Sequence, residues 1–187
     1  MFFRFLAIAA LSLAIAGCMV SYVPPTNEPA AVAQGADSTS FVPYPEELRL
    51  GELLTSAREQ KRDTLRWNET LARVARARAL DMARQGYFSH TTRDGWGANR
   101  LVEQAGYRLP AFYDQAKSGN SIESIGRGYA TPESVWRQWM GSSRHRAHLL
   151  GLNAVFAAQT EYGIGYARVR GPARDHVWVV LIARPGD

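Results

Sequence analysis

Apolar residues recur at helical spacing in the region that begins near residue 45. They predict a first helix over 46–62, with an apolar face formed by Leu50, Leu53, Leu54 and Ala57. A second helix is predicted between Asn68, a residue type that caps helix N-termini, and Gly86, which favours a helix end. Its apolar stripe consists of Leu71, Val74, Ala75, Ala79 and Met82. Arg78 lies on that stripe, so we expect it to be paired, to reach a cleft, or to extend its charge to solvent at the stripe's edge.

Two further helices and a pair of strands are indicated downstream. One helix is predicted over 98–105, and another begins with Thr131 as its cap and Pro132 at its first helical position. Residues 162–169 and 177–183 are rich in Val, Ile and Tyr, and a stretch with Gly and Pro separates them, so they predict a β-hairpin. Helices followed by late antiparallel strands predict an α+β fold in which helices cover a small sheet.

The start of the chain carries a different pattern. Residues 6–16 are apolar apart from one serine, a run too short for a hydrocarbon core, which needs about 20 helical residues. Residues 1–17 are therefore predicted to be a signal peptide. The sequence Ile-Ala-Gly-Cys that ends at Cys18 resembles the lipobox of bacterial lipoproteins, which implies cleavage before Cys18 and lipid attachment to it. An ordinary signal peptide with an incidental cysteine is the alternative.

Residues 18–44 are predicted to be the lipidated cysteine and a flexible tether, because they contain four prolines and no periodic apolar pattern. Residues 45–187 then form one domain. Cys18 is the only cysteine, so no intrachain disulfide stabilises that domain.

By resemblance to the sorting of Gram-negative lipoproteins, Met19 in place of Asp favours the outer membrane. The expected location is the bacterial cell envelope, with a lipid anchor in the outer membrane and the domain facing the periplasm.

The charge distribution argues against one class of partner. Without the predicted signal peptide the chain has 21 basic and 17 acidic residues, and the basic residues are scattered along the sequence. Nucleic-acid-binding domains usually concentrate their basic residues on one face. We therefore expect no nucleic-acid partner.

Four short stretches carry most of the candidate chemistry. They are GYFSH, which ends at His90, SIESI around Glu123, WMGSSRHRAHLLG, which contains His145 and His148, and TEYGIGYA, which starts at Thr160. In this order and spacing they resemble the CAP superfamily of cysteine-rich secretory, antigen 5 and pathogenesis-related 1 proteins, in its bacterial, cysteine-free SCP-like branch. The resemblance covers about 46–183 and implies an α-β-α sandwich with a small central antiparallel sheet flanked by helices.

The resemblance also implies a cleft that gathers two histidines and glutamates. His90 matches the first histidine, Glu123 the glutamate of a Gly-Glu-Asn-Ile sequence, and His145 the second histidine, in the usual Ser-Pro-Gly-His-Arg context. The chain departs from the family at several positions, namely Ser142 at about the place of a second glutamate, Ile122 and Ser124 beside Glu123, and His148 where Asn is frequent. Residues 151–159 include about five more residues than the shortest family pattern and are expected to reshape one cleft wall. The role of His148 is left open.

Three interpretations of this cleft remain open. The first is a binding module for a lipid, glycan or protein of the envelope, attached to the membrane through the lipid on Cys18. The second is a site for Zn²⁺ or another divalent metal, held by His90 and His145 with Glu123 as a third ligand. The third is a hydrolase in which a histidine acts as general base and Glu123 orients it, although the chain has no GxSxG nucleophile motif. The sequence favours binding over catalysis, requires no cofactor, and identifies neither the ligand nor the oligomeric state.

Each of these residues also has a structural interpretation. His90 could bond to a backbone group, Glu123 could pair with Arg127 if that segment were helical, and Ser142 or Ser143 could cap a short helix. Two other polar residues, Glu161 and His176, are expected at the surface. A cluster of large apolar residues is expected in the core: Trp136, Trp139 and Met140.

Overall fold

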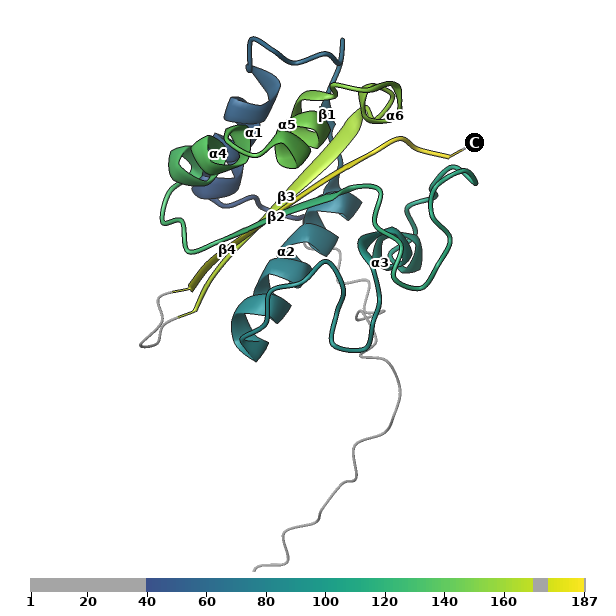
Figure 1. Ribbon diagram of the computed structural model, residues 1–187. Helices are drawn as coiled ribbons and strands as arrows, with labels where there is room; N and C mark the ends of the chain where they lie inside the picture. Colours follow the sequence, from purple (N-terminus) through teal and green to yellow (C-terminus); the bar gives the residue numbers. More distant parts are fainter. Residues whose placement is uncertain (1–39, 170–174, 187) are drawn as a thin grey trace, which may run out of the picture. The chain divides into compact units, whose positions relative to one another are not determined.

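The computed structural model describes residues 40–169 and 175–186 (Figure 1). The predicted signal peptide, Cys18 and most of the predicted tether lie outside the described residues, as does most of the connection between the last two strands. The elements follow in the order α1 (Pro45–Thr55), β1 (Arg66–Trp67), α2 (Glu69–Gln85), α3 (Ala98–Gln104), β2 (Glu123–Arg127), α4 (Pro132–Met140), α5 (Ser143–Leu150), α6 (Ala154–Ala157), β3 (Glu161–Val169) and β4 (Asp175–Ala183). Within the described ranges, no helix is long and apolar enough to span a bilayer.

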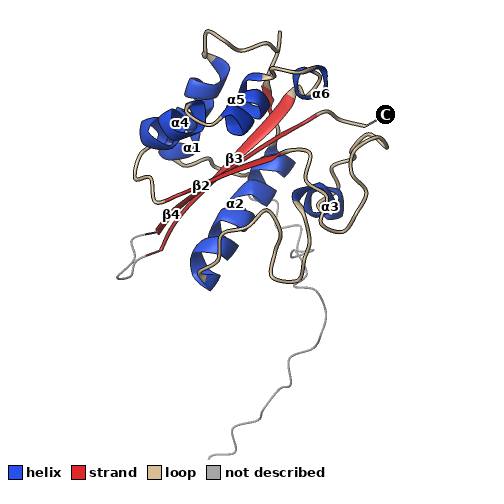
Figure 2. Cartoon of the chain, in the orientation of Figure 1, coloured by secondary structure: helices blue, strands red, loops and turns tan. Residues whose placement is uncertain are grey.

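The sheet lies between two groups of helices. Its strands are arranged in the order β1-β3-β4-β2, with antiparallel β3–β4 and β2–β4 pairs and a short parallel pair between β1 and β3. Helices α2 and α3 cover one face, and α1, α4 and α5 cover the other (Figure 2). This is the predicted α-β-α sandwich. Because β2 is an edge strand, both helical layers can reach its open side.

The central strand β4 divides its side chains between the two cores. Four alternate residues pack towards α2: Val177, Val179, Leu181 and Ala183. The three residues between them, Trp178, Val180 and Ile182, pack towards α1, α4 and α5. Side chains of a strand alternate between faces, so a strand buried on both sides is apolar throughout. This explains why the sequence of β4 reads as a continuous apolar run.

Two glycines of the TEYGIGYA stretch allow α2 to lie directly on β3. A Cβ atom at Gly163 would lie 2.1 Å from the backbone nitrogen of Ala72, and one at Gly165 would lie 2.1 Å from the backbone of Ala75. No side chain fits at such distances, so the close packing of helix and strand requires glycine at both positions. This contact fixes the helix from which Arg78 projects.

Most predicted helix ends are confirmed. Helix α2 follows Asn68, whose side chain accepts a hydrogen bond from the Leu71 amide, and it ends at Gly86 with φ of 68°. Helix α4 follows Thr131 with Pro132 in its first turn. The prediction that the first helix extends beyond Thr55 is wrong, because the chain turns away so that Arg62 can contact the C-terminal end of α5.

Candidate functional site

A cavity of about 580 Å³ lies beside the edge strand β2. Its lining comes from the segment after α2, from β2 and the residues before it, from α5 and from α6. The residues are His90, Asn120, Ser121, Ile122, Glu123, Ser124, Arg144, His145, Ala147, His148 and Phe156. The structure therefore places His90, Glu123 and His145 on one cavity, although they come from three separate segments.

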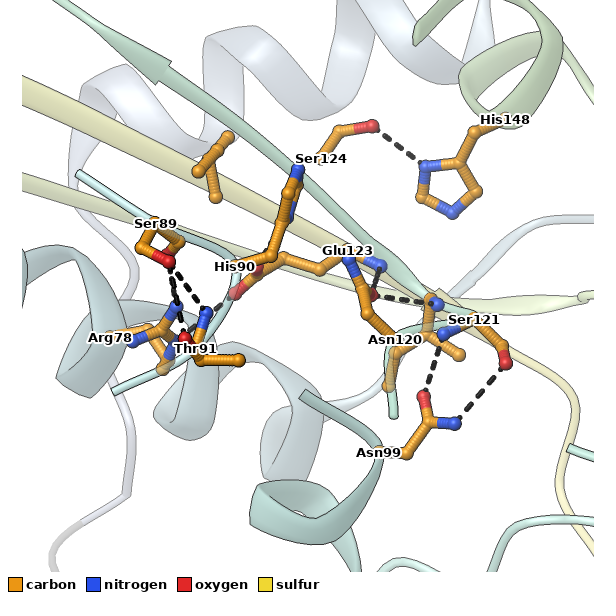
Figure 3. A network of polar contacts seen from close by, with 12 residues as sticks. Arg78, Ser89, His90, Thr91, Asn99, Asn120, Ser121, Glu123, Ser124 and His148 are labelled. Atoms are coloured by element: carbon orange, nitrogen blue, oxygen red, sulfur yellow. Dashed lines mark hydrogen bonds and ion pairs between the residues drawn. The ribbon is translucent and has the colours of Figure 1, made fainter. Parts of the chain in front are cut away.

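Strand alternation sends Glu123 towards α2, and its side chain is fully buried there. Its Oε1 atom accepts a hydrogen bond from Arg78 Nε at 3.1 Å, and its Oε2 atom lies 2.9 Å from His90 Nδ1 (Figure 3). Asn120 Oδ1 accepts a hydrogen bond from the Glu123 backbone amide at 3.0 Å, and this bond fixes the start of β2. Both carboxylate oxygens are thus engaged, and His90 is left with Nε2 for a ligand.

Arg78 connects Glu123 to the segment that contains His90, on the α2 side of the cavity. Arg78 is buried and paired with Glu123. This confirms the first of the three alternatives that its position on the apolar stripe of α2 had left open. Burial alone would lower the pKa of its guanidinium, but the attraction of Glu123 outweighs that cost and raises the pKa. Its Nη2 atom donates to the Ser89 carbonyl at 2.7 Å, and its Nη1 atom donates to the Tyr87 hydroxyl at 2.9 Å. The GYFSH stretch is thereby folded back on α2 with His90 at the cavity.

On the opposite face of the sheet, Ser124 bonds to His148. Adjacent strand residues point to opposite faces, so Ser124 projects towards α5, where its hydroxyl lies 2.8 Å from His148 Nδ1 (Figure 3). His148 is buried, and desolvation, with smaller contributions from Arg62 and His145, lowers its pKa to about 3. Its imidazole is therefore neutral at physiological pH. Ser124 and His148 both replace residue types that the family usually has, and the structure shows that these two departures touch each other.

His145 is half-buried at the start of α5. Its Nδ1 atom lies 2.9 Å from the Ser142 hydroxyl, and its pKa is lowered by desolvation and by the nearby His90. Ser142 occupies the N-cap position of α5, but its side chain makes no capping hydrogen bond. Of the two serines considered as caps, Ser142 or Ser143, Ser142 occupies the cap position, but its hydroxyl bonds to His145 instead of a helix amide.

The segment 151–159 supplies one wall of the cavity through Phe156. The Phe156 ring meets the His148 ring edge to face at 5.1 Å between centroids. Buried Arg62 joins this wall to α5, since its guanidinium donates to the carbonyls of Phe156, His148 and Leu149 at 2.7–2.9 Å. A cation at the C-terminal end of a helix interacts favourably with the helix dipole, which explains a buried arginine held by neutral carbonyls.

Other polar residues singled out in the sequence have structural contacts away from the cavity. Glu161 is half-buried and accepts hydrogen bonds from Asn68 and Tyr107. His176 lies 2.7 Å from the Tyr166 hydroxyl through Nδ1. Trp139 is buried in the core, as expected, and donates to the Ile125 carbonyl.

A family model described as the cysteine-rich secretory protein family, CAP, matches residues 47–182. The chain belongs to the CAP family. YkwD of Bacillus subtilis, a protein of uncharacterised function, is 35% identical to this CAP domain over 120 residues, which is 60% of the chain and 39% of that relative. The chain therefore spans well under half the length of this relative.

Two solved structures share the CAP fold. An outer surface protein from Borrelia burgdorferi aligns with a TM-score of 0.53 and 19% identity, over 74% of this chain and 90% of its own. An extracellular protein with an SCP domain from Bacillus anthracis aligns with a TM-score of 0.54 and 18% identity, over 78% of this chain and 45% of its own. These likenesses show the fold.

His90 and His145 do not form a three-residue metal site with Glu123. In the ranges that the structure describes, no group of three or more His, Cys, Asp or Glu residues is placed to hold a metal ion. Glu123 is committed to Arg78 and His90, while catalytic zinc sites usually have three protein ligands. Glu123 instead occupies the position of a carboxylate that orients a metal-binding imidazole from behind. A metal would have to be held by the Nε2 atoms of His90 and His145 with ligands from outside this set.

The cavity also contains a serine paired with a histidine, Ser124 with His148. A general base works best when its pKa lies near the working pH, so a histidine with a pKa of about 3 is a poor base at neutral pH. The Ser124–His148 pair is therefore better suited to hold the sheet edge to α5 than to activate a nucleophile.

Proposed function

We propose that this CAP domain is a ligand-binding module of the bacterial cell envelope and that its cavity beside β2 holds the ligand. The observation that carries the proposal is a cavity of about 580 Å³ whose polar groups are already fixed by hydrogen bonds from both helical layers. A preformed, partly apolar cavity with a few oriented polar groups is typical of a ligand site.

The attachment to the envelope is a part of this proposal that rests on the sequence. Cys18 would carry the lipid anchor, and residues 18–44 would place the domain on the periplasmic side of the outer membrane. A Cys18→Ala variant should lose incorporation of labelled palmitate and should no longer fractionate with membranes. Unchanged membrane fractionation of this variant would contradict the anchor.

Ligand binding can be tested by recovering what the full chain retains from a native envelope extract. Mass spectrometry should find a compound that co-purifies with the native chain and is lost from a Phe156→Ala, His145→Ala double variant, which alters two cavity walls. A Leu48→Ala variant is the matched control, because Leu48 is exposed on α1 and does not line the cavity. Equal recovery from all three proteins would contradict the proposal.

A divalent metal is the second candidate ligand. It is favoured by the hydrogen bond between Glu123 Oε2 and His90 Nδ1, which leaves Nε2 oriented for coordination. A ligand that binds only the folded state must stabilise it, so added Zn²⁺ should raise the melting temperature of the native chain and not that of a His90→Ala, His145→Ala variant. Hydrolysis has less support, because His148, the histidine that bonds to Ser124, is a poor base at neutral pH.

A further inference from the structure

The open edge of β3 lies on the opposite side of the sheet from the edge strand β2 and its cavity. Strand β1 pairs with only two residues of β3, Glu161 and Tyr162. Within the described ranges, no strand pairs with residues 163–169 on that side. An unpaired edge offers a row of backbone N–H and C=O groups to any other strand, and proteins usually cover or interrupt such edges. This edge of β3 therefore needs a cover.

Glu47 closes the middle of this edge. Its side chain is fully buried near the start of α1, and its Oε1 atom accepts a hydrogen bond from the Tyr166 amide at 3.0 Å. Every second residue of an antiparallel strand points its N–H to the same side, so Arg168 presents its own N–H along the same edge. A hollow of about 350 Å³ lies here, lined in part by Tyr166, Ala167 and Arg168. One carboxylate thus blocks the edge, and open space lies beside it.

Arg76 of α2 holds Glu47 in this position. Its Nε atom donates to Glu47 Oε1 at 2.9 Å, and its Nη2 atom donates to Oε2. The Tyr44 amide donates to the same Oε2 atom at 2.8 Å. A buried carboxylate must be paired with a cation and hydrogen-bonded, and an arginine fork can engage both of its oxygens. The contact of Glu47 with β3 therefore depends on Arg76.

Residues 41–44, which we call the strap, hold Arg76 in turn. The Arg76 guanidinium lies over two aromatic rings of the strap, with Cζ 3.9 Å from the centroid of Phe41 and 4.0 Å from that of Tyr44. Its Nη2 atom also donates to the Val42 carbonyl at 3.0 Å. Stacking on aromatic rings is a specific, favourable contact for a guanidinium, so the strap fixes its orientation. A continuous set of contacts therefore leads from the strap, through Arg76 and its carboxylate partner, to the edge of β3.

We propose that the strap keeps the edge of β3 closed, and that its release lets β3 pair with β3 of a second copy of this chain. A second copy presents the same edge, and two identical edges related by a two-fold axis run antiparallel with matching backbone groups. The strap comes directly after most of the predicted tether, so its release would couple the anchored end of the chain to self-association. The inference does not depend on the ligand cavity, which lies at the other edge of the sheet.

Amide hydrogen exchange tests whether the strap holds the edge closed. The strap variant is Phe41→Ala with Tyr44→Ala in the full chain, which removes both rings from Arg76. Its Tyr166 amide should exchange at least about tenfold faster than in the native chain, because two cation–π contacts are lost. Val42→Ala is the matched control in the same segment, since its side chain is 71% exposed and its carbonyl remains, and it should change this rate less than about twofold.

Cysteine cross-linking tests whether the released edge pairs with a second copy. Arg168→Cys places a thiol beside the edge, in a full chain whose only cysteine is removed by Cys18→Ser. A flexible bismaleimide, which reaches across neighbouring registers, should yield several-fold more cross-linked dimer when the strap variant is added to this background. Arg146→Cys is the control position, because it is exposed on α5 away from β3, and its dimer yield should not change.

A second way of opening the edge keeps the test decisive if the strap variant folds poorly by circular dichroism. Glu47→Gln keeps the size of the side chain and removes the charge that Arg76 pairs with, so it should also raise cross-linking at Arg168→Cys. Equal exchange of the Tyr166 amide with and without the strap rings would overturn the inference. Unchanged cross-linking at Arg168→Cys in both opened variants, or an equal rise at Arg146→Cys from general unfolding, would overturn it as well.

Discussion

The two sides of the sheet hold their cavity histidines by different physical means. On the α2 side, His90 bonds to Glu123, a buried carboxylate that is paired with buried Arg78. On the α5 side, His148 and His145 bond to neutral serine hydroxyls. Removing one partner of a buried ion pair costs more than removing a neutral hydrogen bond. The α2 side should therefore be the rigid half of the cavity, and the α5 side should be the half that accepts sequence change.

Removing Arg78 should have the largest effect on stability. An Arg78→Ala variant leaves the Glu123 carboxylate buried without its cation, which should lower the free energy of unfolding by about 3–5 kcal/mol. Urea unfolding monitored by circular dichroism measures this loss. Replacing both partners, Arg78→Met with Glu123→Gln, should cost less than the sum of the single changes, because no charge is then left buried.

An exposed pair on the same helix provides the control for Arg78. Arg73 bonds to Glu69 with both side chains about half-exposed, so Arg73→Ala should cost less than about 1 kcal/mol. Equal losses for the Arg73 and Arg78 variants would remove the basis for treating the α2 side as the rigid half.

The α5 side should respond most strongly to acid. The pKa of His148 is about 3 in the folded chain and 6.5 when the side chain is free, so the unfolded state binds the extra proton first as the pH falls. Stability from neutral His148 is complete above pH 6.5 and decreases as the pH falls towards 3. Between pH 7 and pH 4 the loss should be about 3 kcal/mol. A His148→Asn variant should lack this part of the acid dependence in unfolding experiments at the two pH values. The same acid loss in both proteins would show that His148 does not cause it.

The fold was largely predictable from sequence, and the reasons are local. The periodic stripe of α2, its Asn68 cap and its Gly86 end depend on neighbouring residues only. Strand β2 was missed because its buried residues include the polar pair Glu123 and Ser124, and burial at a sheet edge between two helical layers is a tertiary property. Arg62 was placed in a helix for a similar reason, since its carbonyl partners lie far away in the chain.

The candidate site was predictable only where a motif marks it. His90, Glu123 and His145 were named through the family resemblance, and the position of Arg78 on an apolar stripe indicated that it needed a partner. The contact between Ser124 and His148 could not be derived, because the two residues are 24 positions apart in sequence. Their contact depends on how β2 packs against α5. Sequence alone therefore identified the α2 side of the cavity, with its charged pair, more fully than the α5 side, with its neutral serine–histidine bonds.

Removing the hydroxyl of Ser124 should have a moderate effect. A Ser124→Ala variant removes the hydroxyl that bonds to Nδ1 of buried His148, which should cost about 1–3 kcal/mol. Replacing Ser124 and His148 together by Asn restores the residue types that the family frequently has. This double variant should be more stable than the Ser124→Ala single variant if the two side chains act as a pair. Additive losses in a double-mutant cycle would contradict direct coupling between them.

The smallest effect is expected for Ser142, and it separates the two roles of a serine at a helix start. A serine that caps a helix through its side chain contributes about 1 kcal/mol, but the Ser142 hydroxyl bonds to His145 instead of a helix amide. Ser142→Ala should therefore change the free energy of unfolding by less than about 0.5 kcal/mol, while the nitrogen-15 chemical shifts of the His145 ring should change. The matched variant Thr131→Ala removes a true side-chain cap, on α4, and should cost about 1 kcal/mol without moving those shifts. A stability loss for Ser142→Ala as large as that for Thr131→Ala, with unchanged His145 shifts, would mean that Ser142 caps α5 in solution and that His145 is held by packing alone.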